Sequence, residues 1–581
     1  MPSQNEVQQF VHRLEEGGWV KWIQLTALVT VCVAMYTLFI FDPFYMGLFK
    51  GLSHPKGMEQ AQIGRELARH HGFSSKTIRP AVINQFKINT GSIPLDNMPD
   101  TYYAPVWPVV MAPFIWIVKS TWLMDTKEFI YPADRMIAGV AAAIFLLSAL
   151  INYFTIRQLF DHQLAILTVG LVLLCDVFWK YSLSGLPQTL MAFFFSGASY
   201  ALVRAVQNRI EERPTMAWLA TASAIFALLA LTHGLTIWIF AGAVVFCAIY
   251  FKPRRLTVLV MVGVFLALYS PWLIRNYHVC GNIGGAAWNT VFYQLRGTEG
   301  SIMRDVEFRT QGITPTIFRF KVQSSIGSQL GDLLNLLGGC VVAPLFFVAL
   351  LHLFKNRAPS IIRWLFLCMW FFGVIGIAVF GFADESGQLQ SNNLHILFIP
   401  MFAAYGFAFL LVMWTRLEIN VSLVQKAFIT LIYALSAIPI FNTLTANQKG
   451  VVQWPPYVPP YIAILHGWTT EDEIIASDMP WAVAWYADRK SLWLPITLQD
   501  FVDLNDNNTL GGRIVGLYLT PVTGNRALIA DIVKGEYKDW APFILRSVNA
   551  KDFPLRAATA LPIDNQCIFY SDHDRWTDRI D

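Results

Sequence analysis

The stretch LTVLVMVGVFLALYSPW, residues 256–272, carries no charged side chain and is bounded by Arg255 on one side and Arg275 on the other. A run of this length can cross the roughly 30 Å hydrocarbon core of a bilayer as a helix. A helix is favoured there because it satisfies its own backbone hydrogen bonds in a medium without water. The stretch therefore predicts a membrane-spanning α-helix.

Runs of the same kind recur along the chain. Hydrophobic residues make up 55% of the 581 residues and charged residues only 14%, and the mean hydropathy is +0.45. These values are far from those of ordinary soluble domains. We expect an α-helical polytopic membrane protein of about eleven transmembrane helices. The expected spans are residues 22–41, 136–155, 162–178, 188–203, 216–231, 235–251, 256–272, 334–354, 361–380, 394–414 and 424–441.

Basic residues in the short connections between these spans predict the orientation of the chain. By the positive-inside rule they favour a cytoplasmic N-terminus and an extracytoplasmic C-terminus. Residues 1–21 lack the apolar core and small-residue cleavage site of a signal peptide, so we expect the first span to be an uncleaved anchor. The net charge of +4 is small for a chain of this length, so it does not indicate a nucleic-acid-binding surface. The basic residues of the inner connections are Arg13, Lys21, Arg157, Arg204, Arg209, Arg213, Lys252, Arg254, Arg255, Lys355, Arg357, Arg363, Arg416 and Lys426.

Three long polar segments are then expected on the outer side: residues 42–135, 273–333 and 442–581. Within the first, Ala104 to Leu123 is apolar but interrupted by prolines, so we expect a re-entrant or interfacial helix rather than a span. The sequence thus predicts a transmembrane domain over 1–441 and a soluble α/β domain over 442–581. A stiff Pro-rich linker, WPPYVPP at 454–460, leads into that domain.

The expected elements of the soluble domain follow from short apolar runs and one amphipathic pattern. We expect strands at 474–478, 492–494 and 513–519, a helix start at 480–487 and a helix at 526–537. Of the seven cysteines, Cys280 and Cys567 are the ones placed to meet an oxidising compartment, where they could pair.

The first outer segment holds an unusual density of ionisable groups, beginning with MEQAQIGR at 58–65. If residues 58–70 form a helix, Glu59 lies near its start, where the helix dipole favours the ionised carboxylate. A carboxylate facing a partly closed cavity suits a general base, because burial tunes its pKa upward. A solvated surface charge is the alternative. The small residues Ala61, Gly64 and Ala68 form another face, suited to packing against helices.

Several cations and histidines lie at span ends or helix breaks. Arg275 ends a span in PWLIRNY, where a guanidinium could bind a lipid phosphate or simply snorkel to the interface. Lys180 and His233 could line a cavity or be structural. Asp384, Glu385 and His395 match no standard metal motif, so a divalent cation has weak support.

Five pieces of this sequence together resemble the GT-C superfamily of membrane glycosyltransferases, of the family 39 type. The resemblance is to bacterial relatives of protein O-mannosyltransferases and lipid A aminoarabinose transferases, and it covers most of the chain. The pieces are MEQAQIGRELARHHGF with Ile78-Arg79-Pro80, YYAPVWPVVMAPF at 102–114, SLSGLPQ at 182–188, PWLIRNY at 271–277 and ASDMPWAVAWYADR at 476–489.

The resemblance implies the GT-C fold and a sugar transfer at the outer face of a bacterial inner membrane. The donor would be a polyprenyl-phosphate sugar and the acceptor a protein, lipid or glycan, with inversion at the anomeric carbon and no required cofactor. It implies Glu59 as the catalytic base. We expect Arg275, Arg79 and Lys180 to bind the donor phosphate. The expected substrate-binding residues are Arg65, Asp100, Tyr103, Gln188, His233 and His395.

The chain departs from its relatives at three positions. Relatives usually have Asp where this chain has Glu59, often an acid at Gln188, and often an Arg-Tyr pair where Asn393-Leu394-His395 stands. A catalytically altered scaffold that binds a partner is therefore the main alternative, and a ligase with pyrophosphate donors is another. A lipid or sugar transporter is less favoured because it predicts inverted repeats and a small tail.

Overall fold

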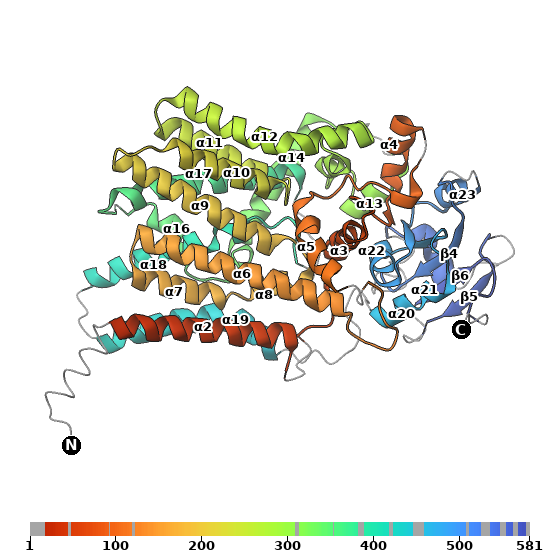
Figure 1. The fold of residues 1–581 in the computed structure, drawn as a ribbon, viewed down its shortest axis with the longest axis horizontal. Coiled ribbons are helices and arrows are strands. Elements are labelled where there is room, and N and C mark those ends of the chain that lie inside the picture. The colour runs from red at the N-terminus through yellow and green to blue at the C-terminus, as the bar shows by residue number, and fades with distance from the viewer. Residues whose placement is uncertain are drawn as a thin grey trace, which may run out of the picture.

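The fold was analysed in a computed structural model of the chain (Figure 1). The structure describes residues 18–576 with interruptions. The residues outside the description are 1–17, 44–47, 92, 119–121, 308–312, 353, 382–388, 418–421, 446–457, 507–509, 524–534, 546–552, 562–566 and 577–581.

A bundle of apolar helices forms most of the molecule. Its long helices run roughly parallel, and the core is rich in stacked rings, such as Phe346 and Phe402 with centroids 3.9 Å apart. The helices are α2 (Gly18–Phe41), α6 (Pro132–Leu159), α7 (His162–Leu173), α8 (Asp176–Ser184), α9 (Gln188–Ile210), α10 (Met216–Ala230), α11 (Thr236–Tyr250), α12 (Arg254–Cys280), α14 (Pro315–Gly331), α15 (Leu333–Leu336), α16 (Leu345–Ala349), α17 (Arg357–Phe380), α18 (Ile399–Arg416) and α19 (Ser422–Thr445).

Seven described helices are long and apolar enough to cross a membrane, and the bent pair α7 and α8, with 52° between its halves, gives an eighth. These lie on predicted spans. The predicted spans 216–231 and 235–251 form α10 and α11, which are apolar but only 15 residues each. At 1.5 Å per residue each is about 22 Å long, less than the bilayer core. The seven long apolar helices, together with the bent pair, make this a multi-pass membrane protein.

The predicted continuous span 334–354 is wrong as a helix. Only the short α15 and α16 lie within it, separated by a break at Gly338 and Gly339, which have φ of +67° and +68°. This left-handed conformation is open to glycine at little cost and ends a helix. A Cβ at Gly338 would lie 2.5 Å from Cγ1 of Val177. Both the positive φ of Gly338 and its close contact with the Val177 side chain therefore require glycine at this position.

A six-stranded sheet lies at one end of the bundle, which we call the sheet end (Figure 1). Its order is β1-β3-β2-β4-β6-β5. Strands β1 to β4 are parallel to one another, and β6 runs antiparallel to both of its neighbours, β4 and β5. The strands are β1 (Thr77–Ile78), β2 (Ile474–Ser477), β3 (Lys490–Trp493), β4 (Ile514–Leu519), β5 (Ala557–Ala560) and β6 (Ile568–Ser571). The predicted strands at 474–478, 492–494 and 513–519 correspond to β2, β3 and β4.

The sheet includes a strand from residues 42–135, far from the other strands in sequence. β1 pairs with β3, with Thr77 opposite Ser491 and Ile78 opposite Leu492. Segments more than 400 residues apart in sequence are thereby joined, so the described part of residues 442–581, which we call the tail, and residues 42–135 form one structure at the sheet end. The predicted helix at 526–537 and the linker at 454–460 fall largely outside the described residues. Cys280 and Cys567 are both free.

Short helices connect the sheet to the bundle. Among them is α5, a helix of 12 residues within the stretch Ala104 to Leu123, where a re-entrant or interfacial helix is expected. They are α3 (Pro55–Ala68), α4 (Pro80–Thr90), α5 (Val106–Ile117), α13 (Glu299–Arg304), α20 (Pro459–Ala463), α21 (Leu465–Trp468), α22 (Pro480–Ala482), the π-helix η5 (Val483–Ala487), α23 (Leu498–Asp506), α25 (Ala541–Ile544) and the 3-10 turns η1 (Leu95–Asn97), η3 (Ala286–Phe292), η4 (His395–Phe398) and η6 (Lys538–Trp540).

Helix α3 is the central element of the sheet end. Its small-residue face packs on α5 as predicted, since a Cβ at Gly64 would lie 3.3 Å from the carbonyl oxygen of Pro108. At the start of α3, a Cβ on Gly57 would lie 2.2 Å from the carbonyl oxygen of Ser184. The helix is thus held between α5 and the turn that follows α8, which fixes the direction of its polar face.

Candidate active site

Glu59 lies on α3 with only 4% of its surface exposed. Its Oε2 is 2.5 Å from Nη2 of Arg79 and also accepts a hydrogen bond from the Tyr103 hydroxyl. Among the described residues no group donates to Oε1. One oxygen is therefore fixed by a cation and a hydroxyl, and the other is left for a further donor.

The surroundings of Glu59 act on its pKa in opposite directions. Burial raises the pKa of the carboxyl, while the Arg79 guanidinium and the Tyr103 hydroxyl lower it. The net direction is upward from the usual glutamate value. A carboxylate of raised pKa is a stronger proton acceptor than a solvated one.

Arg79 is placed by its local sequence. It follows β1 directly and precedes Pro80, which begins α4, and a residue before proline favours extended backbone, here φ −97° and ψ 124°. Its Nη1 is 3.3 Å from Oδ2 of Asp100, and its guanidinium lies 4.5 Å from the ring centre of Tyr102. The pairing of β1 with β3 therefore sets the position of the cation that faces Glu59.

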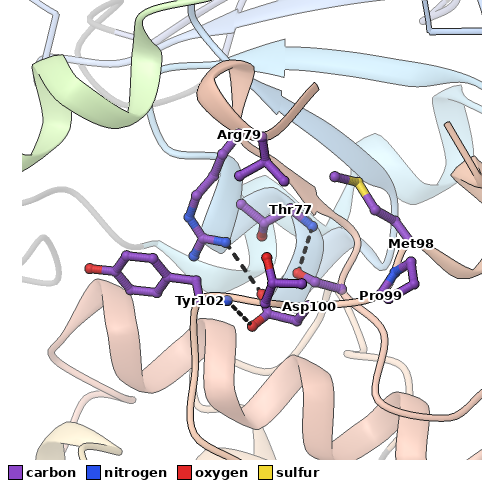
Figure 2. Close-up of a pocket in the computed structure, with 9 residues that line it drawn as sticks. Thr77, Arg79, Met98, Pro99, Asp100 and Tyr102 are labelled. Atoms are coloured by element: carbon purple, nitrogen blue, oxygen red, sulfur yellow. Dashed lines mark hydrogen bonds and ion pairs between the residues drawn. The ribbon is translucent and has the colours of Figure 1, made fainter. Parts of the chain in front are cut away.

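Asp100 organises the loop that carries the two tyrosines. Its Oδ1 accepts from the backbone N–H of Tyr102 at 2.9 Å, while Oδ2 faces Arg79 (Figure 2). Oδ1 also accepts from the backbone N–H of Tyr103 at 2.8 Å. Arg79, Asp100 and Tyr102 line a cavity of about 10 Å³ together with Ser75, Thr77 and Met98. That volume is roughly enough for one water molecule, so this cavity is too small for a sugar.

Arg275 lies on the far side of the same loop. Its Nη1 donates to the carbonyl oxygen of Asp100 and to Oδ1 of Asn276, and its Nη2 donates to the carbonyl oxygen of Phe73 at 3.3 Å. The guanidinium also stacks 4.6 Å from the ring centre of Trp272. The structure therefore brings Arg275 next to Asp100, with these donors directed at backbone and amide oxygens.

A second polar group adjoins Glu59 through the start of α3. Nζ of Lys56 is 2.7 Å from Oε2 of Glu299 and 2.9 Å from Oγ of Ser391. The Gln188 side chain donates to the carbonyl oxygen of Ser391 at 2.6 Å. Burial and, to a smaller extent, the charge of Lys56 lower the pKa of His233 to about 4. Gln188 and His233 thus meet Lys56 through the segment that carries Ser391.

Three predicted site residues have other surroundings. Lys180 forms an ion pair with Asp176 on its own helix. His395 accepts from Trp370 Nε1 at 3.0 Å and lies 3.1 Å from Oε1 of Gln329. For Lys180 and His395, no contact with the Glu59 cluster is found within the part of the chain that the structure describes.

Arg65 is the third predicted site residue with other surroundings. It is fully buried, and its guanidinium points toward the tail. It donates to the carbonyl oxygens of Ala484 and Trp485 at 2.7 and 2.8 Å and lies 3.1 Å from Oδ1 of Asp488. These carbonyls belong to the π-helix η5, whose ends leave acceptors unsatisfied. Arg65 therefore ties α3 to the tail.

The sequence interpretation missed Lys56, Tyr102, Glu299 and Ser391. Two of them had a signal, because Lys56 precedes Glu59 by three helical positions and Tyr102 adjoins Tyr103. Glu299 and Ser391 come from segments far along the chain, and nothing in their local sequence marks them. No group of three or more potential metal ligands occurs among the residues described, and Asp384 and Glu385 lie outside them.

The sequence matches no protein-family model and no curated protein. Solved structures do match. The AglB oligosaccharyltransferase from Archaeoglobus fulgidus, in complex with an inhibitory peptide and a dolichol-phosphate, is 14% identical with a TM-score of 0.53, over 91% of this chain and 73% of that one. ArnT from Cupriavidus metallidurans in the apo state is 13% identical with a TM-score of 0.52, over 95% and 98%.

A second ArnT structure is bound to undecaprenyl phosphate. It is 12% identical to this chain, with a TM-score of 0.51, and the alignment covers 96% of this chain and 98% of that one. At such identities the similarity is one of fold. It extends over the bundle and the sheet end together, because nearly the whole of this chain is covered.

Proposed function

The chain has the GT-C fold of membrane glycosyltransferases, and on that premise we propose that it transfers a sugar from a polyprenyl-phosphate carrier to an acceptor hydroxyl at the sheet end. The acceptor belongs to a protein, a lipid or a glycan. The reaction is a single displacement that inverts the anomeric centre, with Glu59 as the general base. The proposed location is the outer face of a bacterial inner membrane.

One observation carries the proposal: the buried Glu59 carboxylate has one oxygen fixed by Arg79 and Tyr103, while Oε1 accepts from none of the described residues. Burial raises the pKa of this carboxyl, and Arg79 and Tyr103 oppose the rise. An ionised carboxylate with a preorganised position and an unused oxygen is what proton abstraction from a hydroxyl requires. Two solved neighbours are described as complexes with dolichol-phosphate and undecaprenyl phosphate, which supports a lipid-phosphate carrier.

The proposed step balances as follows. Oε1 of Glu59 takes the proton of the acceptor hydroxyl, and the acceptor oxygen forms the new bond to the anomeric carbon. The bond from that carbon to the phosphate oxygen breaks, and its electron pair stays with the departing polyprenyl phosphate. Nearby cations stabilise the charge that develops on this leaving group. Of the cations proposed for this role, Arg79 is paired with Glu59 and Arg275 with the carbonyl oxygen of Asp100, whereas Lys180 is paired with Asp176.

Substitution of the base tests the proposal. We expect Glu59→Gln to lower the release of polyprenyl phosphate by roughly 10² to 10⁴-fold, because the amide cannot accept the proton. Release is measured with the purified full chain, a polyprenyl-phosphate sugar and a hydroxyl acceptor. Unchanged turnover would remove Glu59 from the mechanism.

Glu66→Gln is the matched control. Glu66 lies on the same helix with 3% exposure, and its carboxylate contacts Arg69 and His71 instead of Arg79. The Glu66→Gln variant thus removes one negative charge from α3, as Glu59→Gln does, but leaves the proposed base unchanged. Turnover of this variant should stay close to that of the parent, and thermal unfolding of both variants reports whether the fold is retained.

A catalytically inactive scaffold is the second candidate, and two observations favour it. The cavity beside Arg79 holds only about 10 Å³, and Gln188 stands where relatives often carry an acid. A scaffold would show no carrier release with any donor lipid, in the parent chain as well as in Glu59→Gln. A screen of polyprenyl-phosphate sugars against the parent chain therefore separates the two candidates.

A further inference from the structure

The Glu299 carboxylate is enclosed by donors from other segments of the chain. Its Oε1 accepts from the Tyr102 hydroxyl, and its Oε2 lies 2.7 Å from Nζ of Lys56. The Lys56 ammonium also donates to Oγ of Ser391 at 2.9 Å. An ammonium and a phenol thus converge on one anion, a geometry that gives strong charge-assisted hydrogen bonds.

We propose that the position of the Glu299 carboxylate is the binding site for the phosphate of the lipid donor, with Lys56 and Tyr102 as its ligands. Glu299 occupies this site as an internal anion and leaves it when the donor binds. The inference rests on the proposed function, since that function supplies an anionic lipid. A phosphodiester resembles a carboxylate in charge and in having two acceptor oxygens.

The site lies next to the proposed base by two routes. Lys56 is on α3, three residues before Glu59, so both side chains leave the same face of the helix. The ring of Tyr102 lies against the Arg79 guanidinium, which is itself paired with Glu59. An inverting displacement needs the base and the leaving phosphate close enough to flank one anomeric carbon. The proposed base and the proposed phosphate site are neighbours in this arrangement.

Lys56 is better suited to release its counter-ion than the two neighbouring arginines. Arg79 is paired with Glu59 and Asp100, so a phosphate there would compete with the base. Arg275 donates to the backbone carbonyls of Phe73 and Asp100, which hold the loop. Glu299 belongs to a separate six-residue helix, α13, and its withdrawal leaves the ion pair of the base intact.

Helix α13 is fastened at its other end to the tail. Arg304 donates to the carbonyl oxygens of Leu494 and Pro495 at 2.6 and 3.2 Å, and its guanidinium lies 3.7 Å from the ring centre of Tyr537. The side chains of Lys56 and Glu299 are only 16% and 18% exposed, so their ion pair is largely shielded from water. Glu299 therefore competes directly with the donor.

Binding of a short-chain polyprenyl phosphate to the purified full chain tests this competition. We expect Glu299→Gln to lower the apparent Kd by about threefold or more, because an internal competitor reduces the fraction of binding-competent protein. Lys56→Met should raise the Kd by about tenfold or more, also when combined with Glu299→Gln. Lys56→Arg should retain most of the affinity. The exposed Glu128→Gln is the charge-matched control and should not change the Kd.

The probes separate the sources of binding. The unphosphorylated polyprenol should bind equally to the parent chain and to Lys56→Met, and inorganic phosphate should compete with the lipid only weakly. An unchanged Kd in Lys56→Met, with folding verified by thermal unfolding, would overturn the phosphate site even if Glu59→Gln abolishes turnover. Lys56-dependent binding without any sugar transfer would instead uphold the site and reject the proposed reaction.

Discussion

Glu59 shows how a side chain that looks like a surface charge in sequence becomes a buried one in the fold. The helix expected at 58–70 is α3 (Pro55–Ala68), and its small-residue face was correctly predicted. The partner Arg79 could not be placed from sequence, because its position depends on the pairing of β1 with β3. Glu299 and Ser391 could not be placed either, since they meet Lys56 only through long-range packing.

The pH dependence of transfer should report the environment of Glu59. Burial raises the pKa of its carboxyl, so activity should fall as pH drops through a value above the ordinary glutamate pKa of about 4.3. The Tyr103 hydroxyl bond lowers this pKa, and Tyr103→Phe should therefore move the acidic limb of kcat/KM to higher pH. An acidic limb that stays in place in this variant would argue against Glu59 as the titrating group.

At the scale of elements, the molecule depends on close backbone contacts that glycine permits. Gly57 at the start of α3 meets the turn after α8, and Gly338 and Gly339 interrupt a run that was predicted as one span. Hydropathy alone could not detect that interruption, because the flanking residues remain apolar. The strands of the tail were located from their short apolar runs, since their pattern is local.

Gly57→Ala should weaken the attachment of α3 to the bundle. Its Cβ would lie 2.2 Å from the carbonyl oxygen of Ser184 and 2.9 Å from the carbonyl carbon of Gly185, and neither backbone atom can rotate away. We expect a loss of stability of about 1–3 kcal/mol, the usual cost of overpacking, with reduced turnover. Gly263→Ala on α12 is the control, because nothing lies within 4 Å of its Cβ. Thermal unfolding in detergent measures both, and equal midpoints would contradict this reading of the contact.

At the scale of the whole molecule, a buried ion cluster joins the bundle-linked α3 to the tail. The Asp488 carboxylate oxygens lie 3.1 Å from Nη2 of Arg65, 2.9 Å from Nη1 of Arg69 and 2.6 Å from Nζ of Lys76. Burial raises the pKa of Asp488, but the three cations outweigh it and the net pKa is well below the usual value. The stabilisation from this carboxylate is therefore present above the pKa of an unfolded aspartate and is lost as pH falls through the folded value.

Asp488→Asn should destabilise the sheet end without straining the backbone. The residue has φ +54°, which asparagine adopts about as readily as aspartate. Because Arg65 would remain buried beside a neutral group, we expect a loss of about 3–5 kcal/mol. Proteolysis at the sheet end and thermal unfolding measure the change, with the exposed Asp574→Asn as control. Equal stability of the two variants would show that the cluster does not join α3 to the tail.

The pairing of β1 with β3 also sets an order of assembly. Ribosomes complete residues 42–135 long before they reach β3, and domains usually fold as they emerge. Here the segment that carries Arg79 pairs, at Thr77 and Ile78, with a strand that is synthesised about 400 residues later. A nascent chain thus enters the bilayer before β3 can pair with β1, and a product of premature termination carries Glu59 and Arg79 without the strand that positions Arg79.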